Sequence, residues 1–485
     1  MKHEMKKQYG MQYIVVAVCI VFAYMCSRIF FLSENPILYK MGMGIGIFIV
    51  LGYAAILYRK NKCGEEMVIS FIIVLGCLMR IGYMLYTPCE VRAHDLGTIS
   101  LDSNGHASYL LHIILNKQLP STNEIQFYQQ PFFYMLAGTV SKGVNVMLGS
   151  DDPYYYIDAA KIVPCIASCY TLILSQSICN LFHVTGKAKV YAIVLIAFCP
   201  TFFLIGKDVN SDALITFMMA LAFYYTLLWD QNPTWKNTIC MAFVFGIGMM
   251  TKVSCLVVVV FTACVMLRRF ILSVKEKRTK AMISRFFVFV AISFPTGLWY
   301  YIRNFIKFRQ LPTYVPVSGG VDSILYTGDH SLVERFFSID WNNLIQTPYA
   351  DPFTDYNAPV YYIKSSMFGE YSFDIIEIIP RIMLLFACIL AVMSIFVFVR
   401  GLCQFRENSM EKNMILGLTF LLLLSYAWFY YRYPVGCSMD FRYMAILVLL
   451  FGMLLGSFEN RKYQICLTVC LTAYSISSCL MYIMI

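Results

Sequence analysis

The chain's first long polar stretch, Thr87–Tyr134, carries residues that could act chemically on a hydroxyl group. It holds three of the six histidines, His94, His106 and His112, and Asp95 directly follows His94. A carboxylate within hydrogen-bond reach of a hydroxyl can accept its proton. Asp95 is therefore a candidate general base, and an aspartate that caps a turn is the alternative explanation.

The same stretch contains weak candidates for a metal site. Asp102 and His106 are four residues apart, so on a helix they would share a face. They could hold a divalent metal with His330 as a further ligand, but a carboxylate at a helix amino terminus explains Asp102 equally well. His94 could orient Asp95, contact a phosphate, or simply be an exposed loop histidine. The sequence indicates no certain cofactor and leaves a divalent metal open.

Several cations stand at the ends of apolar segments, where they could bind a phosphate through charge-assisted hydrogen bonds. These candidates are Lys207, Lys252, Arg303 and Arg442. For each of them, a cation that reaches from the end of a span toward water is the alternative. Asp208 and Asp212 could pair with Lys207, or one of them could be the base in place of Asp95. Asp440 could pair with Arg442.

The composition indicates which elements position these residues. The 485 residues are 59% hydrophobic and only 14% charged, whereas soluble domains carry about 25% charged residues. Apolar runs of roughly 20 residues recur, so we predict an all-α integral membrane protein with about 13 transmembrane helices, give or take one or two. The weakest prediction is the pair of short spans Asn237–Met250 and Val253–Leu267, where one bent helix is the alternative.

The distribution of lysine and arginine predicts the orientation. The net charge of +10 does not point to nucleic acid, because the basic residues lie mainly in short loops that alternate spans place on one side. We take that side as cytoplasmic. The opposite, extracytoplasmic face then collects the loop 87–156, the segment 304–377 and the turns at Lys207, Thr251 and Arg442. We expect a multi-pass cell-membrane protein whose active face is extracytoplasmic, since clustered polar residues at membrane depth usually mark function.

Within the first outer loop, two segments read as helices that lie along the membrane. An apolar stripe predicts the first over Ser103–Asn116, and the second is predicted over Phe132–Leu148. An aromatic–proline string, Tyr128-Gln129-Gln130-Pro131-Phe132-Phe133-Tyr134, joins them.

This order of features resembles the C-type glycosyltransferases (GT-C fold), which include the protein O-mannosyltransferases and the lipid A aminoarabinose transferase. In that superfamily an acidic residue follows the first core helix, and interfacial helices and a string of the form YxPPLYY come next. Here Asp95 and the string above match, with one proline where two are common. Asn210–Leu214, Thr251-Lys252 and Arg303-Asn304 resemble later strings of the superfamily.

The resemblance implies a division of the chain into parts. Residues 67–303 would form a seven-helix glycosyltransferase core with its first outer loop at 87–156, and residues 304–377 a second large outer loop. Residues 1–66 would be an additional N-terminal transmembrane hairpin, which departs from the superfamily pattern. Residues 378–485 would be C-terminal transmembrane helices.

The resemblance also implies an activity: an inverting membrane glycosyltransferase that moves a sugar from a polyprenyl-phosphate donor to an extracytoplasmic acceptor. The acceptor would be a cell-envelope glycan, lipid or protein, and the other partner would be the lipid bilayer. Tyr128 and Tyr134 could line a sugar or lipid groove, or belong to an interfacial aromatic belt. A transporter or flippase of lipid-linked glycans, or a ligase of them, is the alternative. Transporters usually show repeats and charges near the midplane, whereas here no repeat is seen and the charges cluster at one face, which favours the enzyme.

Overall fold

The computed structural model describes residues 2–30, 35–61, 64–312 and 323–485. Across these ranges the chain forms helices and one isolated bridge, between Tyr326 and Val435, and no strand. The predicted all-α class is confirmed. The predicted outer segment 304–377 is described except for residues 313–322, which lie outside the described residues.

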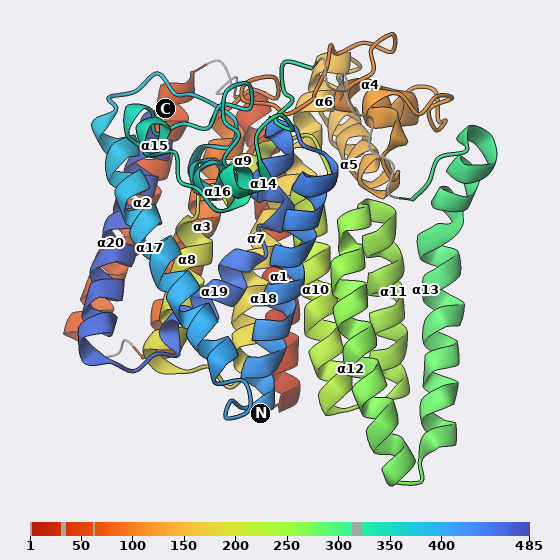
Figure 1. Ribbon diagram of the computed structural model, residues 1–485. Helices are drawn as coiled ribbons and strands as arrows, with labels where there is room; N and C mark the ends of the chain where they lie inside the picture. The colour runs from red at the N-terminus through yellow and green to blue at the C-terminus, as the bar shows by residue number, and fades with distance from the viewer. Residues whose placement is uncertain (1, 31–34, 62–63, 313–322) are drawn as a thin grey trace. The chain divides into compact units, whose positions relative to one another are not determined.

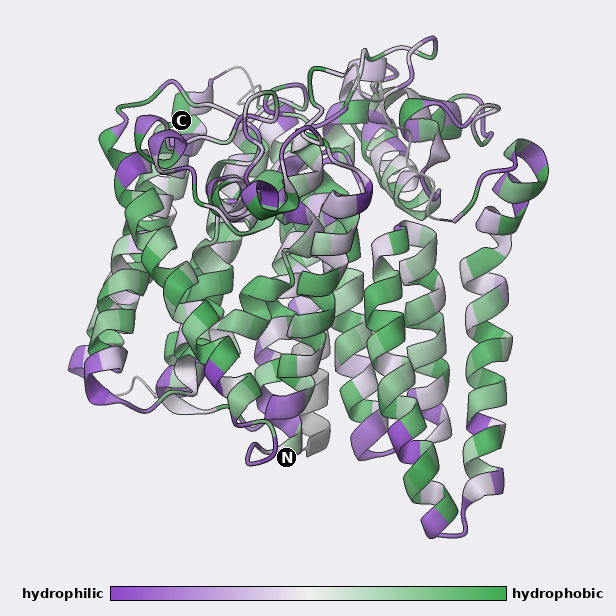
Figure 2. Ribbon diagram, viewed as in Figure 1, coloured by the Kyte–Doolittle hydropathy of each residue, from purple (hydrophilic) through white to green (hydrophobic). Residues whose placement is uncertain are grey.

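Ten helices within the described residues are long and apolar enough to cross a membrane, or up to twelve if each of two bent pairs forms one span. Figure 2 shows these helices as apolar over most of their length, with polar residues gathered toward their ends and in the loops. The chain is therefore a multi-pass helical membrane protein, but the predicted count of about 13 is not confirmed.

The difference in count comes from breaks in the helices. The predicted span Ala188–Gly206 is the pair α8 (Gly186–Phe198) and α9 (Thr201–Lys207), which is bent by 45°. Pro200 lies in this break, and proline lacks the amide hydrogen that would continue a helix. The predicted span Asn237–Met250 falls within α11 (Trp235–Thr251), whose 17 residues lie at the short end of the range that crosses a bilayer, so it is not counted among the ten.

The described chain divides into two compact units. Unit 1 comprises residues 1–29, 88–181 and 208–316, and unit 2 comprises residues 30–87, 182–207 and 317–485. The two helices of the predicted N-terminal hairpin belong to different units: α1 (Lys2–Ile29) to unit 1 and α2 (Pro36–Arg59) to unit 2. The predicted functional division of the chain stays a prediction.

Unit 1 combines short helices of the first outer loop with long apolar helices (Figure 1). The predicted loop helices are confirmed as α4 (His106–Ile114) and α5 (Phe132–Leu148), and the short η2 (Ile125–Tyr128) precedes α5. The other helices of unit 1 are α6 (Pro153–Ala160), α7 (Ile162–Leu181), α10 (Asp212–Gln231), η3 (Val253–Cys255), α12 (Leu256–Lys275) and α13 (Thr279–Phe308), with α1 and α11.

Unit 2 holds the remaining spans and the described residues 323–377 of the second outer segment. Besides α2, α8 and α9, its helices are α3 (Glu65–Tyr86), α14 (Leu332–Phe336), α15 (Trp341–Gln346), α16 (Ala358–Phe368), α17 (Ile378–Cys403), α18 (Met410–Arg432), η4 (Gly436–Met439), η5 (Phe441–Met444), α19 (Leu447–Gly456) and α20 (Arg461–Met484).

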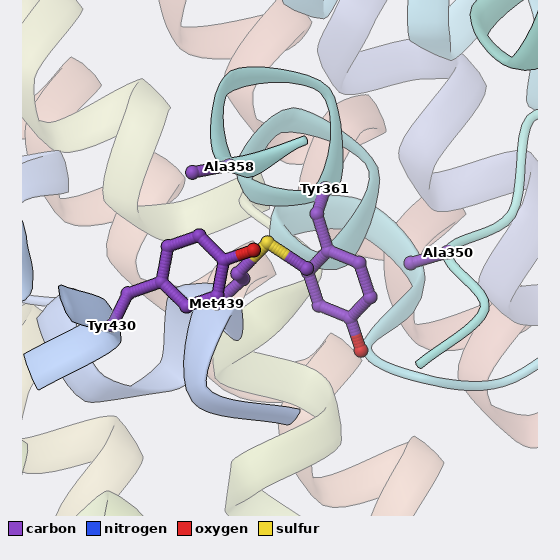
Figure 3. Close-up of a cluster of buried hydrophobic side chains, with 5 residues drawn as sticks. All are labelled: Ala350, Ala358, Tyr361, Tyr430 and Met439. Atoms are coloured by element: carbon purple, nitrogen blue, oxygen red, sulfur yellow. The ribbon is translucent and has the colours of Figure 1, made fainter. Parts of the chain in front are cut away.

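A small core joins the second outer segment to the spans of unit 2. Figure 3 shows Tyr361 of α16 and Tyr430 of α18 on either side of Met439, with Ala350 and Ala358 beside them. The Tyr430 hydroxyl also donates to the backbone oxygen of Tyr356, at 2.6 Å. The described residues 323–377 of this segment therefore form a folded cap on α18.

Candidate active site

The turn that carries Asp95 is fixed to the start of α4. The His106 amide donates to the Asp95 carbonyl at 3.0 Å, and the Ala107 amide donates to the Leu96 carbonyl at 2.9 Å. These contacts satisfy amide groups that a helix leaves without partners at its amino terminus. Asp95 itself has a φ of +50°, a region of backbone space that costs free energy for most residues and that aspartate tolerates better than most.

Gly105 allows this close approach. A Cβ atom at this position would lie 2.2 Å from the Leu96 carbonyl oxygen and 2.6 Å from the Gly97 Cα atom. Both neighbours are backbone atoms, so the turn would have to move. The absence of a side chain at Gly105 thus helps to hold the Asp95 turn against α4.

The Asp95 carboxylate is held by two neighbours and still reaches solvent. Gln126 Nε2 donates to Asp95 Oδ2 at 2.6 Å, and His94 Nε2 lies 2.9 Å from the same oxygen. The Asp95 side chain is 45% exposed. A carboxylate that is oriented by donors and open on one side has the geometry that a general base needs.

A hydrogen-bond network leads inward from Asp95. Gln129 donates to the side-chain oxygen of Gln126, and the Ser211 hydroxyl donates to Gln129 Oε1 at 3.4 Å. The Tyr134 hydroxyl lies 3.4 Å from Gln129 Oε1 and 2.6 Å from His106 Nδ1. The network connects the first outer loop to Ser211, the residue that precedes α10.

His106 is a buried, neutral member of this network. Burial lowers its pKa from 6.5 to about 3, although the negative charges of Asp95 and Asp212 act to raise it. Burial also raises the pKa of the Tyr134 hydroxyl well above its usual value of 10. Tyr134 is fully buried, so it supports the network from within and does not line an open groove. Tyr128, in η2, is half-buried, and its role in lining a sugar or lipid groove stays a prediction.

Asp212 and Lys252 form an ion pair between α10 and the break after α11. Lys252 Nζ donates to Asp212 Oδ1, and the Asp212 side chain is 4% exposed while that of Lys252 is 18% exposed. Asp212 directly follows Ser211, so this pair adjoins the network that ends at Ser211. The pairing commits the Asp212 carboxylate to a cation, which makes it a poorer candidate base than the solvent-reachable Asp95.

Arg303 binds the backbone of the segment that precedes η2. Its Nη2 donates to the Pro120 carbonyl at 3.1 Å, and its Nη1 donates to Asn304 Oδ1 at 2.7 Å. One turn earlier on α13, the Tyr300 hydroxyl donates to the Phe127 carbonyl at 3.4 Å. The guanidinium therefore has a structural task that the sequence did not indicate, beside the predicted contact with phosphate.

Two further predictions concern the carboxylates Asp102 and Asp208. The prediction that Asp102 and His106 share a helix face is wrong, because α4 begins only at His106 and Asp102 lies in an exposed turn before it. Asp208, in the turn before α10, is buried. Its predicted role as a rival base stays a prediction.

The remaining predicted residues belong to unit 2. Lys207, at the end of α9, is fully buried. Arg442 Nη1 lies 3.9 Å from Glu370 Oε1 and 3.9 Å from Asp440 Oδ2, which agrees with the predicted pairing of Asp440. The His330 ring stacks on Tyr356 with ring centroids 3.7 Å apart.

The suggested divalent-metal site finds no support in the described part of the chain. Within it, no group of three or more His, Cys, Asp or Glu side chains is arranged to hold a metal ion. His106 Nδ1 is already engaged by Tyr134. The sequence also did not indicate the roles of Gln126 and Gln129 in orienting Asp95, and only the density of glutamines between residues 126 and 130 could have drawn attention to them.

Residues 157–299 match the family model described as dolichyl-phosphate-mannose-protein mannosyltransferase. The match runs from α6 into α13 and includes Ser211, Asp212 and Lys252. It confirms the predicted resemblance to this group of membrane transferases. No curated protein matches the chain.

Two solved structures share a distant likeness with the chain. One, of ArnT from Cupriavidus metallidurans in the apo state, is 14% identical, with 72% of this chain and 71% of that chain covered and a TM-score of 0.32. The other, of the same protein bound to undecaprenyl phosphate, is 12% identical, with 80% and 76% covered and a TM-score of 0.35. At TM-scores this low, neither likeness supports a conclusion about this chain.

Proposed function

We propose that this protein is a membrane glycosyltransferase that moves a sugar from a polyprenyl phosphate to an acceptor hydroxyl. The family match over residues 157–299 supports the class of reaction. The observation that carries the assignment of the base is the Asp95 carboxylate, held by Gln126 and His94 yet 45% exposed. The ten to twelve apolar helices support a donor that is anchored in the bilayer.

In the proposed reaction, the acceptor oxygen attacks the anomeric carbon of the sugar. A new carbon–oxygen bond forms there, and the bond from that carbon to the phosphate oxygen breaks on the opposite side, which inverts the configuration. The electron pair stays on the phosphate oxygen, and the acceptor proton passes to Asp95. The phosphate leaves as a stable anion, so it needs positive charge more than a proton donor.

Lys252 is the proposed phosphate contact in unit 1. Its ion pair with Asp212 fixes the ammonium next to the network that reaches Asp95, and its side chain is 18% exposed. We propose the same role for Lys207 and Arg442 of unit 2. Arg303 would contact the donor only in addition to its clasp on Pro120.

The positive charges of the short loops support an extracytoplasmic site for this reaction. The connection between α12 and α13 carries Lys275, Lys277, Arg278 and Lys280, which would face the cytoplasm. The first outer loop, which follows α3, would then lie on the other side. The acceptor would be a cell-envelope glycan, lipid or protein.

The test is Asp95→Asn, which keeps the shape of the side chain but cannot accept the proton. General-base catalysis contributes about 10²–10⁴-fold, so transfer of label from polyprenyl-phosphate mannose should fall at least about a hundredfold while binding of that donor persists. Asp102→Asn, in the same loop but outside the network, is the control. If Asp95→Asn transfers sugar at a near-normal rate, Asp95 is not the base. If Asp208→Asn and Asp212→Asn are also active, a transporter of lipid-linked sugars becomes the better explanation.

A further inference from the structure

The short helices α14 and α15 of unit 2 direct large apolar side chains outward. Phe337 is 82% exposed, Ile345 67% and Trp341 62%. We call the exposed apolar side chains of this region the cap patch: Leu332, Val333, Phe337, Ile339, Trp341 and Ile345. A cluster of this kind is costly in water and usually marks a surface that an apolar partner covers.

The inward side of α14 is fastened to a membrane-spanning helix. Arg335 is buried, its Nη2 donates to the Tyr430 carbonyl at 2.6 Å, and its guanidinium lies 4.2 Å from the centre of the Tyr430 ring. Tyr430 stands in the last turn of α18. Since Arg335 faces inward, its neighbours Val333 and Phe337 are turned away from the protein.

A second arginine fastens α15 to the next span. Arg381 Nη1 donates to the Ile345 carbonyl at 2.5 Å, and its Nη2 donates to the Gln346 carbonyl at 3.0 Å. Arg381 lies in the first turn of α17, and Figure 1 shows α15 at this end of α17. Because α17 and α18 follow one another as spans, the first turn of α17 and the last turn of α18 belong to the same side of the membrane.

These two attachments place the cap patch at the edge of the bilayer. Near the end of α18, Trp428 and Tyr431 are exposed, with ring centroids 5.8 Å apart, as in the aromatic belt that marks a membrane–water interface. Along α17, Ile378, Ile382 and Leu385 are exposed on the apolar outer surface of the span. The patch thus continues a surface that already faces lipid.

We propose that the cap patch inserts into the headgroup–acyl boundary of the leaflet at this end of α17 and α18. Segments of this kind bury their apolar face about 5–10 Å into that boundary. The six side chains carry no charge, and Glu334 and Asp340 are their acidic neighbours, so apolar area rather than anionic headgroups drives the insertion. The bilayer would then hold the cap beside the spans. This anchoring does not depend on the proposed transfer reaction.

The experiment uses the full-length protein in nanodiscs of phosphatidylcholine, with its five tryptophans. Quenching of fluorescence by phosphatidylcholine brominated near the glycerol end of the acyl chain is compared with quenching by aqueous iodide. Trp341→Phe should remove a component that brominated lipid quenches and iodide does not. Trp229→Phe is the matched control, because Trp229 is fully buried and its component should resist both quenchers. Addition of anionic phosphatidylglycerol should not change the result.

Two outcomes would overturn the proposal. If iodide quenches the Trp341 component and brominated lipid does not, the patch faces water. If neither quencher reaches it, a second copy of the chain or another protein covers the patch instead. Because the readout needs no turnover, either result is distinct from a failure of the proposed glycosyl transfer.

Discussion

Replacing Gln126 with leucine removes the donor that holds the Asp95 carboxylate. The bond between Gln126 Nε2 and Asp95 Oδ2 is 2.6 Å long and Gln126 is 8% exposed, so the leucine would put an apolar side chain where the donor was. A hydrogen bond to a charged group is worth about 1.5–3 kcal/mol. If the bond orients the base in the transition state, the loss corresponds to a fall of about 10- to 100-fold in kcat.

The same bond predicts a change in pH dependence that a purely structural role would not produce. A donor that favours the ionised carboxylate keeps the base active at lower pH. Its loss should therefore move the acidic limb of the pH–rate profile toward higher pH. His94, 2.9 Å from the same oxygen, remains and limits the shift.

The assay is the initial rate of sugar transfer from polyprenyl-phosphate mannose in nanodiscs, measured over a range from about pH 4.5 to about pH 8.5. Gln130→Leu is the matched control: Gln130 is also buried, and within the described residues its side chain makes no hydrogen bond to the network. An acidic limb that stays in place for Gln126→Leu, with full kcat, would refute the orienting role of Gln126.

Three further predictions concern the neighbours of this site. Lys252→Met should lower the thermal stability, because it removes the ammonium that pairs with the buried Asp212 carboxylate, a loss of about 3–5 kcal/mol; the double variant with Asp212→Leu should recover much of it, and a calorimetric scan in detergent compares the two. His106 is neutral in the folded protein, with a pKa lowered by burial from 6.5 to about 3, so the unfolded state binds the extra proton. The free energy of unfolding therefore falls by at most about 1.4 kcal/mol for each pH unit as the pH drops from 6.5 toward 3, and this effect is absent above pH 6.5. The melting temperature of the His106→Gln variant should fall less on acidification than that of the unchanged protein. Gly105→Ala should displace the Asp95 turn, since the added Cβ would meet the Leu96 carbonyl, and should reduce kcat more than donor binding in the same transfer assay.

Helices whose limits follow from the spacing of apolar residues could be predicted from the sequence. The helix Phe132–Leu148 begins and ends where the sequence predicted, because its apolar pattern and the flanking Pro131 and Gly149 are local signals. The count of spans could not be predicted equally well. The bends at Pro200 and after Met444 depend on which neighbouring groups satisfy the interrupted backbone, and that information is not local.

The candidate site was predictable at its charged residues and not at its neutral ones. Asp95 stood out as a carboxylate in a long polar loop, whereas Gln126 and Ser211 join its network only through folding. The spacing of Asp102 and His106 misled because it assumed that a helix already ran through Asp102, whereas Gly105 delays its start. Lys252 was singled out as a cation, but its pairing with Asp212 requires the approach of two segments 40 residues apart in the chain.

Arg80 illustrates how a charge inside a span can serve the site without touching it. Ionisable residues at membrane depth usually mark a function, and Arg80 of α3 is 1% exposed. Its guanidinium donates to the Ile196 and Ala197 carbonyls at 2.7 and 2.8 Å, which lie in the last turn of α8, next to the break at Pro200. These carbonyls would otherwise lack partners in a water-free environment. Arg80 therefore stabilises the 45° bend from which α9 leads to Lys207, so the position of a proposed phosphate contact depends on a cation of the neighbouring helix α3.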